Sequence, residues 1–240
     1  MQAALRIILA HVDSTHGIDH ALAVQHHCMM ACEEAGILGT REANICIIAG
    51  LLHDADDRKY HPDSFYPDGR CNYRNARTVM AQTQVPLDVL DQVLVCISLV
   101  SYSANGDSRV WPADHPKAGE AIPEWMLYPR YADRLEASGE IGYKRCHDYT
   151  VTRGGMIIHP ETPLFRTTEE VYAEVERRRG QYQLTGQSRS VIDHYYDKII
   201  PLSRAACENA NPYFSRQFQE KHQYDLSVVR DSRPLWHALE

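Results

Sequence analysis

The sequence predicts an all-α protein that folds as a single domain over residues 1–240. Three observations support this expectation. Each long apolar segment repeats its hydrophobic residues at helical spacing. Only Thr150–Pro163 has the glycine, proline and β-branched residues of a strand pair, and it could hold a short hairpin at most. A chain with 44% hydrophobic residues can bury one substantial core or two small ones, and its length does not require a split.

The N-terminal part is predicted to form three helices. Residues 2–13 have helical periodicity, and Asp13-Ser14-Thr15 can cap a second helix that begins near His16 and stops at Gly36. A third helix can start at Thr40 and end at His53-Asp54. Its apolar residues are too dense for a solvent-facing surface, so the helix should be buried on most sides. The predicted core is Ile45, Ile48, Leu51, Leu52, Val93, Leu94 and Ile97.

Proline and glycine divide the rest of the chain. Residues 61–69 read as a loop, and residues 103–116 as a longer loop that either borders a site or is disordered. Gly139 and Gly142 are predicted to break the chain before Tyr143. A capping arrangement begins at Thr167 and is expected to be structural. The remaining predicted helices are 73–83, 87–100, 123–137, 167–179, 188–202 and 205–221.

Composition excludes several classes of function. The net charge of −7 argues against binding to nucleic acid polymers, which requires a basic surface. No run of 18 apolar residues and no basic-then-apolar leader pattern occurs, so we expect a cytoplasmic protein with no membrane partner. Seven irregularly spaced cysteines are typical of reduced thiols. Cys28 and Cys32 share one helix face, which favours core packing over zinc binding. The sequence does not indicate an oligomeric state.

The stretch Leu51–Lys59 joins the buried helix to a cluster of charges. His53 and Asp54 stand side by side where the helix ends, and burying both is costly unless a cation receives them. The pair therefore suggests a metal ion. The alternative is a capped helix end at the surface, which such dipeptides commonly form. His20 upstream and Asp133 downstream extend the pattern to H…HD…D and favour the metal.

This pattern resembles the HD-domain superfamily of metal-dependent phosphohydrolases. More narrowly, it is similar to the small bacterial HD hydrolases that include nucleoside triphosphate pyrophosphohydrolases. These share LLHD-x-D-D-x-K, an ADRLEA-SG-x-IG-x-x-R block and a late S-x-x-x-H-x-Y-x-K helix, found here at Leu51–Lys59, Ala132–Arg145 and Ser190–Ile199. The resemblance covers residues 10–220 in order and implies an HD-type helical fold with the C-terminal helices packed on the core.

The resemblance implies roles for individual residues. The metal ligands would be His20, His53, Asp54 and Asp133. His16, on the same helical face as His20, would be second-shell or would face the substrate. Asp57, with possible help from Asp56, would relay a proton, although relatives carry a longer acidic residue there. Lys59 and Arg145 would bind phosphate; the competing interpretation of Lys59 is a solvated lysine. Lys198 or His194 would reach the same pocket, and the competing interpretation of these two residues is simple packing. Ala23 departs from the family, which often has arginine there.

Two histidines and two carboxylates suit one divalent ion, and mixed nitrogen and oxygen ligands favour Mn, Fe, Co, Ni or Zn over Mg. A di-iron or cyclic-nucleotide HD enzyme would need two further helical histidines, and only His61 and His115 lie in the interval, both beside proline. The resemblance to the small bacterial HD hydrolases implies hydrolysis of a small phosphate compound, a nucleoside or deoxynucleoside triphosphate cut to monophosphate and pyrophosphate. The alternatives are a 5′-nucleotidase, a phosphatase for a non-nucleotide metabolite, and a metal-bound nucleotide sensor.

Overall fold

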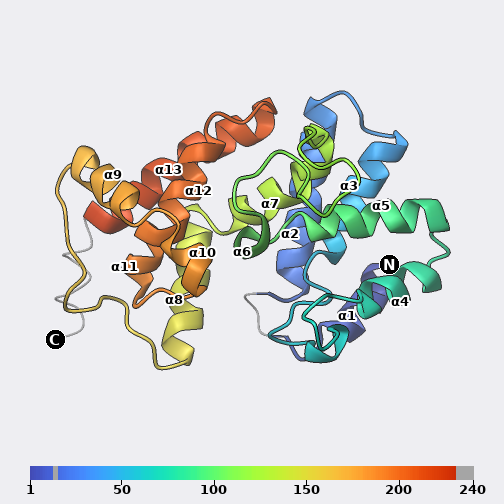
Figure 1. Ribbon diagram of the computed structural model, residues 1–240, viewed down its shortest axis with the longest axis horizontal. Coiled ribbons are helices and arrows are strands. Elements are labelled where there is room, and N and C mark those ends of the chain that lie inside the picture. Colours follow the sequence, from blue (N-terminus) through green and yellow to red (C-terminus); the bar gives the residue numbers. More distant parts are fainter. Residues whose placement is uncertain (13–15, 231–240) are drawn as a thin grey trace. The chain divides into compact units, whose positions relative to one another are not determined.

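The computed structural model describes residues 1–12 and 16–230. Its contacts divide these residues into two compact units, shown in Figure 1. The first unit holds residues 1–101 and 108–133, and the second holds residues 102–107 and 134–230. The single domain stays a prediction.

The first unit is built around α3. Its helices are α1 (Gln2–Ile8), α2 (Ile18–Glu34), α3 (Arg41–Leu52), α4 (Arg74–Gln82), α5 (Leu87–Ser98), the short 3-10 turns η1 (Pro62–Ser64) and η2 (Glu124–Leu127), and the start of α7 (Tyr128–Glu136). Helix α3 packs against both α2 and α5, which explains its dense apolar sequence (Figure 1). The predicted core residues Ile45, Leu51, Leu52, Val93, Leu94 and Ile97 are buried, and Ile48 is half-buried.

The start of α3 follows the sequence closely. Thr40 adopts an extended backbone, and its hydroxyl accepts a hydrogen bond from the Ala43 N–H at 3.2 Å, which satisfies one of the free donors of the first turn. Helix α2 begins at Ile18 after Gly17. The predicted cap at Asp13-Ser14-Thr15 lies outside the described residues.

The second unit is also helical. It contains the end of α7, α6 (Tyr102–Asn105), α8 (Gly139–Thr152), α9 (Thr168–Arg177), α10 (Gln181–Thr185), α11 (Val191–His194), the π-helical turn η3 (Tyr195–Ile199), α12 (Ile200–Ala206) and α13 (Pro212–Arg230). Helix α13 packs against α12 and α8. The core of the second unit includes Val171, Ile192, Tyr195, Ile200 and Val229. Thr167 and Glu170 form the predicted capping box, each side chain bonding the other's backbone N–H.

Some predicted boundaries were wrong. Gly142 does not break the chain but lies inside α8, where a Cβ would come within 2.2 Å of the Ala137 backbone. The glycine is therefore required for close packing. The predicted helix 205–221 is divided, because α12 ends at Ala206 and α13 starts at Pro212. Asn209 and Asn211 stabilise the turn between α12 and α13. Their side-chain oxygens accept hydrogen bonds from the backbone N–H groups of Asn211 and Tyr213, respectively.

The prediction of an all-α fold is confirmed. Among the described residues, extended pairing is limited to three isolated bridges, Phe65 with Cys71, Val110 with Ala121, and Met156 with Ser190. No helix in residues 1–12 and 16–230 combines the length and the hydropathy that crossing a bilayer requires.

Candidate metal centre

Three helices of the first unit each bring part of the H…HD…D pattern to one place. His20 lies in the first turn of α2, His53 follows the last residue of α3, and Asp54 comes next in the chain. Asp133 lies on α7. The buried guanidinium of Arg130, one turn earlier, donates from Nε to the Leu99 carbonyl at 2.7 Å, which helps fix the position of this helix. Sequence reasoning did not identify Arg130.

The donor atoms of the four side chains point at one another. The His20 and His53 Nε2 atoms are 3.2 Å apart. The Asp54 carboxylate oxygen lies 3.3 Å from His53 Nε2 and 3.7 Å from His20 Nε2. The Asp133 oxygen lies 3.3 Å from His20 Nε2 and 3.6 Å from His53 Nε2. Two imidazoles and two carboxylates therefore share one small volume.

These separations fit a common ion. Ligand atoms bound at about 2.0–2.2 Å to one transition metal lie roughly 3.0–3.4 Å apart in octahedral or tetrahedral arrangements. The separations measured here are close to that range, and His20, His53 and Asp54 by themselves form a group able to hold a metal. The donor set is thus suited to a divalent ion without a large rearrangement.

The second nitrogen of His53 fixes the orientation of its ring. Nδ1 lies 2.9 Å from the carbonyl oxygen of Gly50 within α3, so this nitrogen donates and Nε2 keeps its lone pair for the centre. Gly50 also lies tight against α2, where an added Cβ would come within 2.7 Å of the Cys28 thiol. The glycine lets α3 approach α2 closely enough for their histidines to meet.

Burial and charge act in opposite directions on the titrating groups of this cluster. Burial disfavours the protonated form of His53, yet the charge of Asp54 and hydrogen bonds to Asp133 and Asp54 hold the pKa of His53 well above its ordinary value. Burial likewise raises the pKa of Asp54, but the His53 charge and hydrogen bond lower it below its ordinary value. The pKa of Asp133 is also lowered, through its hydrogen bonds with His20 and His53 and despite burial. The cluster attracts positive charge, as a proton or as a metal ion.

One side of the centre is accessible. The His20 and His53 side chains are almost fully buried, whereas the Asp133 side chain keeps 33% of its surface exposed. A catalytic metal site needs such an opening, because water or substrate must occupy a ligand position that the protein leaves open.

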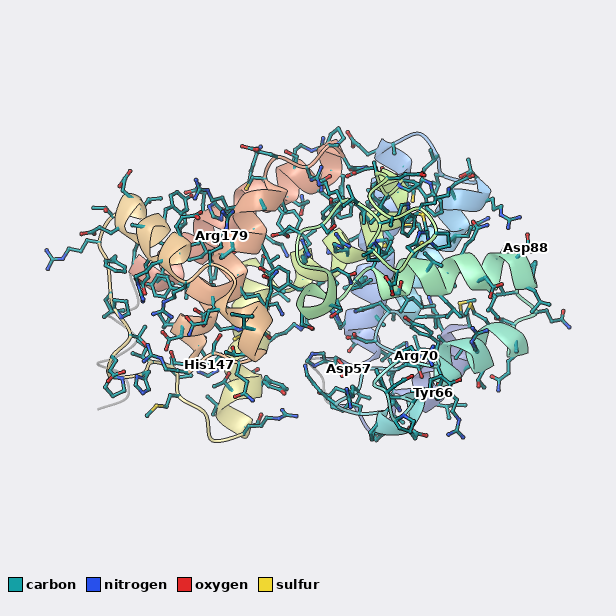
Figure 2. The ribbon with its side chains drawn as sticks, in the orientation of Figure 1. Asp57, Tyr66, Arg70, Asp88, His147 and Arg179 are labelled. Atoms are coloured by element: carbon teal, nitrogen blue, oxygen red, sulfur yellow. The ribbon has the colours of Figure 1, made fainter. Side chains whose placement is uncertain are left out.

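A second group adjoins the first. Ligand atoms of His16, Asp54 and Asp57 lie within 4.8 Å of one another, so Asp54 belongs to both groups. The Tyr60 hydroxyl is 3.3 Å from His16 Nδ1. Asp57 accepts a bond from the Lys59 N–H at 2.8 Å and stands on the loop after α3, where Figure 2 labels it. Tyr60 was not identified from the sequence, which offers no signal for it beyond its place after Lys59.

Asp56 has a different environment from Asp57. Its carboxylate is buried and accepts bonds from the backbone N–H groups of Asn75 and Ala76, each at 2.9 Å, and from the Ser64 hydroxyl. It therefore caps the start of α4 and ties the loop to that helix. Because both of its oxygens are engaged in this way, we do not assign Asp56 a part in proton transfer.

The predicted phosphate-binding residues fall in both units. Lys59 is exposed beside Asp57 in the first unit. In the second unit Arg145 donates to the Glu136 carbonyl at 3.0 Å, and the Lys198 ammonium lies 5.1 Å from the centre of the Tyr182 ring. Their roles stay predictions. His61 and His115 belong to neither metal-binding group among the described residues, and His115 instead stacks on Trp111 with ring centres 4.0 Å apart.

Comparison with known sequences gives one clear relative. The chain is 32% identical over 229 residues to the uncharacterized protein L803 of Acanthamoeba polyphaga mimivirus, spanning 89% of this chain and 86% of that protein. No family model matches the sequence.

Solved structures share the fold at lower identity. A protein from Lactobacillus plantarum superposes with a TM-score of 0.67 at 22% identity, over 99% of this chain and 95% of that one. An HD-superfamily hydrolase from Bacillus thuringiensis gives 0.61 at 18%, over 99% and 95%. YpgQ of Bacillus subtilis, in complex with ADP, gives 0.60 at 15%, over 98% and 97%. The chain therefore has the all-helical fold of these proteins.

Proposed function

We propose that this chain is a metal-dependent phosphohydrolase. The premise is that it belongs to one family with the mimivirus protein L803 and has the HD-superfamily hydrolase fold. The observation that carries the proposal is the convergence of two imidazole nitrogens and two carboxylates on one partly open site. The finer proposal is hydrolysis of a nucleoside or deoxynucleoside triphosphate. The ADP bound to YpgQ supports a nucleotide substrate, because that protein shares the fold.

His20, His53, Asp54 and Asp133 would hold one divalent ion, of Mn, Fe, Co, Ni or Zn. When bound, such an ion polarises a phosphoryl oxygen and lowers the pKa of a coordinated water. The hydrogen bond from His53 to the Gly50 carbonyl keeps that histidine in the tautomer whose Nε2 is free to bind.

Asp57 is the proposed proton acceptor. One of its oxygens is held by the Lys59 N–H, which leaves the other to take a proton from the attacking water. The water oxygen forms a bond to the α-phosphorus. The bond between the α-phosphorus and the oxygen that links it to the β-phosphorus breaks, and pyrophosphate leaves. Lys59 would offset charge on the phosphate chain as a flexible point charge. His16 lies 3.3 Å from the Tyr60 hydroxyl, has a ring nitrogen within 4.8 Å of Asp54 and Asp57, and would contact the substrate.

The test is a substrate panel of nucleoside mono-, di- and triphosphates, run with Mn, Co, Ni and Mg and read by phosphorus NMR. Pyrophosphate released from triphosphates supports the proposal. Orthophosphate released from monophosphates would reassign the protein as a nucleotidase. Tight nucleotide binding without turnover, in protein with its full metal content, would make it a sensor.

A matched pair of variants tests the role of Asp57. Asp57→Asn should lower kcat by roughly 10²- to 10⁴-fold, the range for loss of a general base, with the bound metal retained. Asp68→Asn makes the same change on an exposed residue and should leave kcat unchanged. Equal rates for Asp57→Asn and the unmodified protein would remove Asp57 from the mechanism.

A further inference from the structure

A second group of possible metal ligands adjoins the metal centre in the first unit. One ligand atom from each of His16, Asp54 and Asp57 lies within 4.8 Å of the other two. Donors that bind one divalent ion at about 2.0–2.2 Å lie up to roughly 4.4 Å apart when they take opposite positions around it. Small side-chain rotations would therefore allow all three residues to bind one ion.

The backbone holds the two carboxylates of this group on the same side of the loop after α3. The Asp57 N–H donates to the Asp54 carbonyl at 3.1 Å and closes a turn in which side chains three residues apart lie above one another. The Tyr60 and His61 N–H groups then donate to the Asp57 carbonyl at 3.0 and 2.8 Å, which fixes the continuation of the loop. The close approach of the two carboxylates is thus a consequence of the local fold.

Asp54 can serve both groups through its two oxygens. Its contacts with His20 and His53, at 3.7 and 3.3 Å, both use Oδ2. Its Oδ1 is then the oxygen with which it can bind a second ion, together with His16 and Asp57. In hydrolytic sites with two metals the ions lie about 3.5–4 Å apart, a separation that one carboxylate can span.

No basic side chain neutralises the two carboxylates. Among the residues that the structure describes, neither Asp54 nor Asp57 forms an ion pair with an arginine or lysine side chain, and Asp57 Oδ1 accepts a bond from the backbone N–H of Lys59 at 2.8 Å. Buried carboxylates of the second unit differ in this respect. There a set that we call the Arg178 cluster pairs Arg178 with Glu174, Asp193 and Asp197.

Charge and exposure both favour a second cation. The carboxylates of Asp54, Asp57 and Asp133 together carry more negative charge than one divalent ion neutralises, so a cation is still attracted after the first ion has bound. All three side chains of the second group are half-buried, which leaves them accessible from solvent. Repulsion between the two ions, and the sharing of Asp54, should make the second ion the weaker one.

We propose that His16, Asp54 and Asp57 form a second divalent-cation site, of lower affinity than the first, with Asp54 bridging the two ions. One nitrogen and two oxygen ligands suit Mn, Fe, Co or Zn, with water in the remaining positions. His16 precedes His20 and lies outside the interval in which a di-iron HD enzyme would carry its additional histidines, so this ligand set is a different one.

Occupation of this site would withdraw Asp57 from proton transfer. A bound cation lowers the pKa of a carboxylate and makes it a weaker proton acceptor. His16 could not contact the substrate at the same time. An excess of metal should therefore inhibit hydrolysis. This consequence rests on the proposed function, whereas the existence of the site does not.

Electron paramagnetic resonance of the full chain titrated with Mn²⁺ tests the site without reference to activity. The first equivalent of Mn²⁺ should give the spectrum of an isolated ion. Further Mn²⁺ should add the more closely spaced lines of an exchange-coupled pair, because ions that share one carboxylate lie about 3.5–4 Å apart. Binding of one ion only, or of a second ion without coupling, would overturn the proposal.

A matched pair of histidine variants locates the second ion. His16→Ala should keep the first ion, which shows that the centre has folded, and should weaken the second by roughly tenfold or more, with loss of the coupled spectrum. His26→Ala removes an exposed histidine of α2 that belongs to neither group and should leave the coupled spectrum unchanged. A coupled spectrum in His16→Ala at unchanged Mn²⁺ affinity would reject His16 and the site with it.

Rates of hydrolysis over the same range of Mn²⁺ concentration test the inhibition. The rate should fall as the coupled spectrum grows, with the same midpoint. A rate that stays level or rises during this growth would contradict the withdrawal of Asp57. Absence of any turnover would contradict the proposed function and would leave the spectroscopic evidence to decide on the site.

Discussion

The metal centre of the first unit and the Arg178 cluster of the second gather acidic side chains in different ways. In the centre, Asp54 and Asp133 face the Nε2 atoms of two histidines, and all four groups offer lone pairs. In the cluster, Glu174, Asp193 and Asp197 surround one arginine that cannot lose its proton. A permanent cation makes a cluster structural, whereas converging lone pairs form a site at which an ion can bind and dissociate.

The same contrast appears in the pKa values. The Asp193 carboxyl has a lowered pKa because hydrogen bonds from Arg178 and Thr162 outweigh its burial. The metal centre depends instead on a proton at His53 when no metal is bound, since Asp54 and Asp133 raise the pKa of that histidine. The Arg178 cluster is thus neutralised internally, whereas the candidate metal centre would exchange a proton for a metal ion.

The largest effect should come from removing a ligand of the centre. His53→Ala and Asp54→Ala each leave an incomplete set of ligands and should abolish stoichiometric metal binding, with at least roughly a 10³-fold loss of hydrolysis. Metal analysis of purified protein gives the readout, with Asp88→Asn, an exposed carboxylate paired to Arg41, as the control. Full metal content in both alanine variants would reject the assignment.

Removing the arginine of the second cluster should produce the opposite pattern. Arg178→Met leaves three buried carboxylates without their shared cation, and should lower the free energy of unfolding by about 3–5 kcal/mol. Metal content at moderate temperature should stay stoichiometric. Urea unfolding followed by circular dichroism measures the loss, and Arg179→Met, on an exposed residue labelled in Figure 2, should cost less than about 1 kcal/mol. Similar losses for the two variants would show that the cluster is not structural.

A smaller effect is expected from pH. A metal must displace the proton of His53, whose pKa lies well above its ordinary 6.5. Below this raised pKa His53 is protonated, so the apparent metal affinity should fall as pH decreases, by roughly tenfold per pH unit for one displaced proton. The decline should begin above pH 6.5, earlier than for an unperturbed histidine.

Competition with a chelator of known pH dependence measures this profile. His147→Gln, at a half-buried histidine of the second unit that Figure 2 labels, should leave this profile unchanged. An affinity that is constant from pH 8 down to pH 6 would show that His53 carries no proton in the metal-free protein.

Much of the fold followed from local patterns. Helical periodicity predicted the buried α3, and six of the seven predicted core residues are buried. Thr40 and Thr167 marked two helix starts correctly. These features depend on neighbours within one or two turns, which the sequence specifies directly. Gly142 was misread because its role depends on contact with Ala137 and not on its own conformational preference.

The sequence by itself determined which residue types are present, the adjacency of His53 and Asp54, and the shared helical face of His16 and His20. Only the tertiary structure brought α2, α3 and α7 together so that His20 and Asp133 meet that pair. It also separated Asp56, which caps α4, from Asp57, which adjoins the centre, and gave Arg178 its three carboxylates. Backbone periodicity is encoded over a few residues, whereas the direction in which a side chain points at a distant partner is decided by packing.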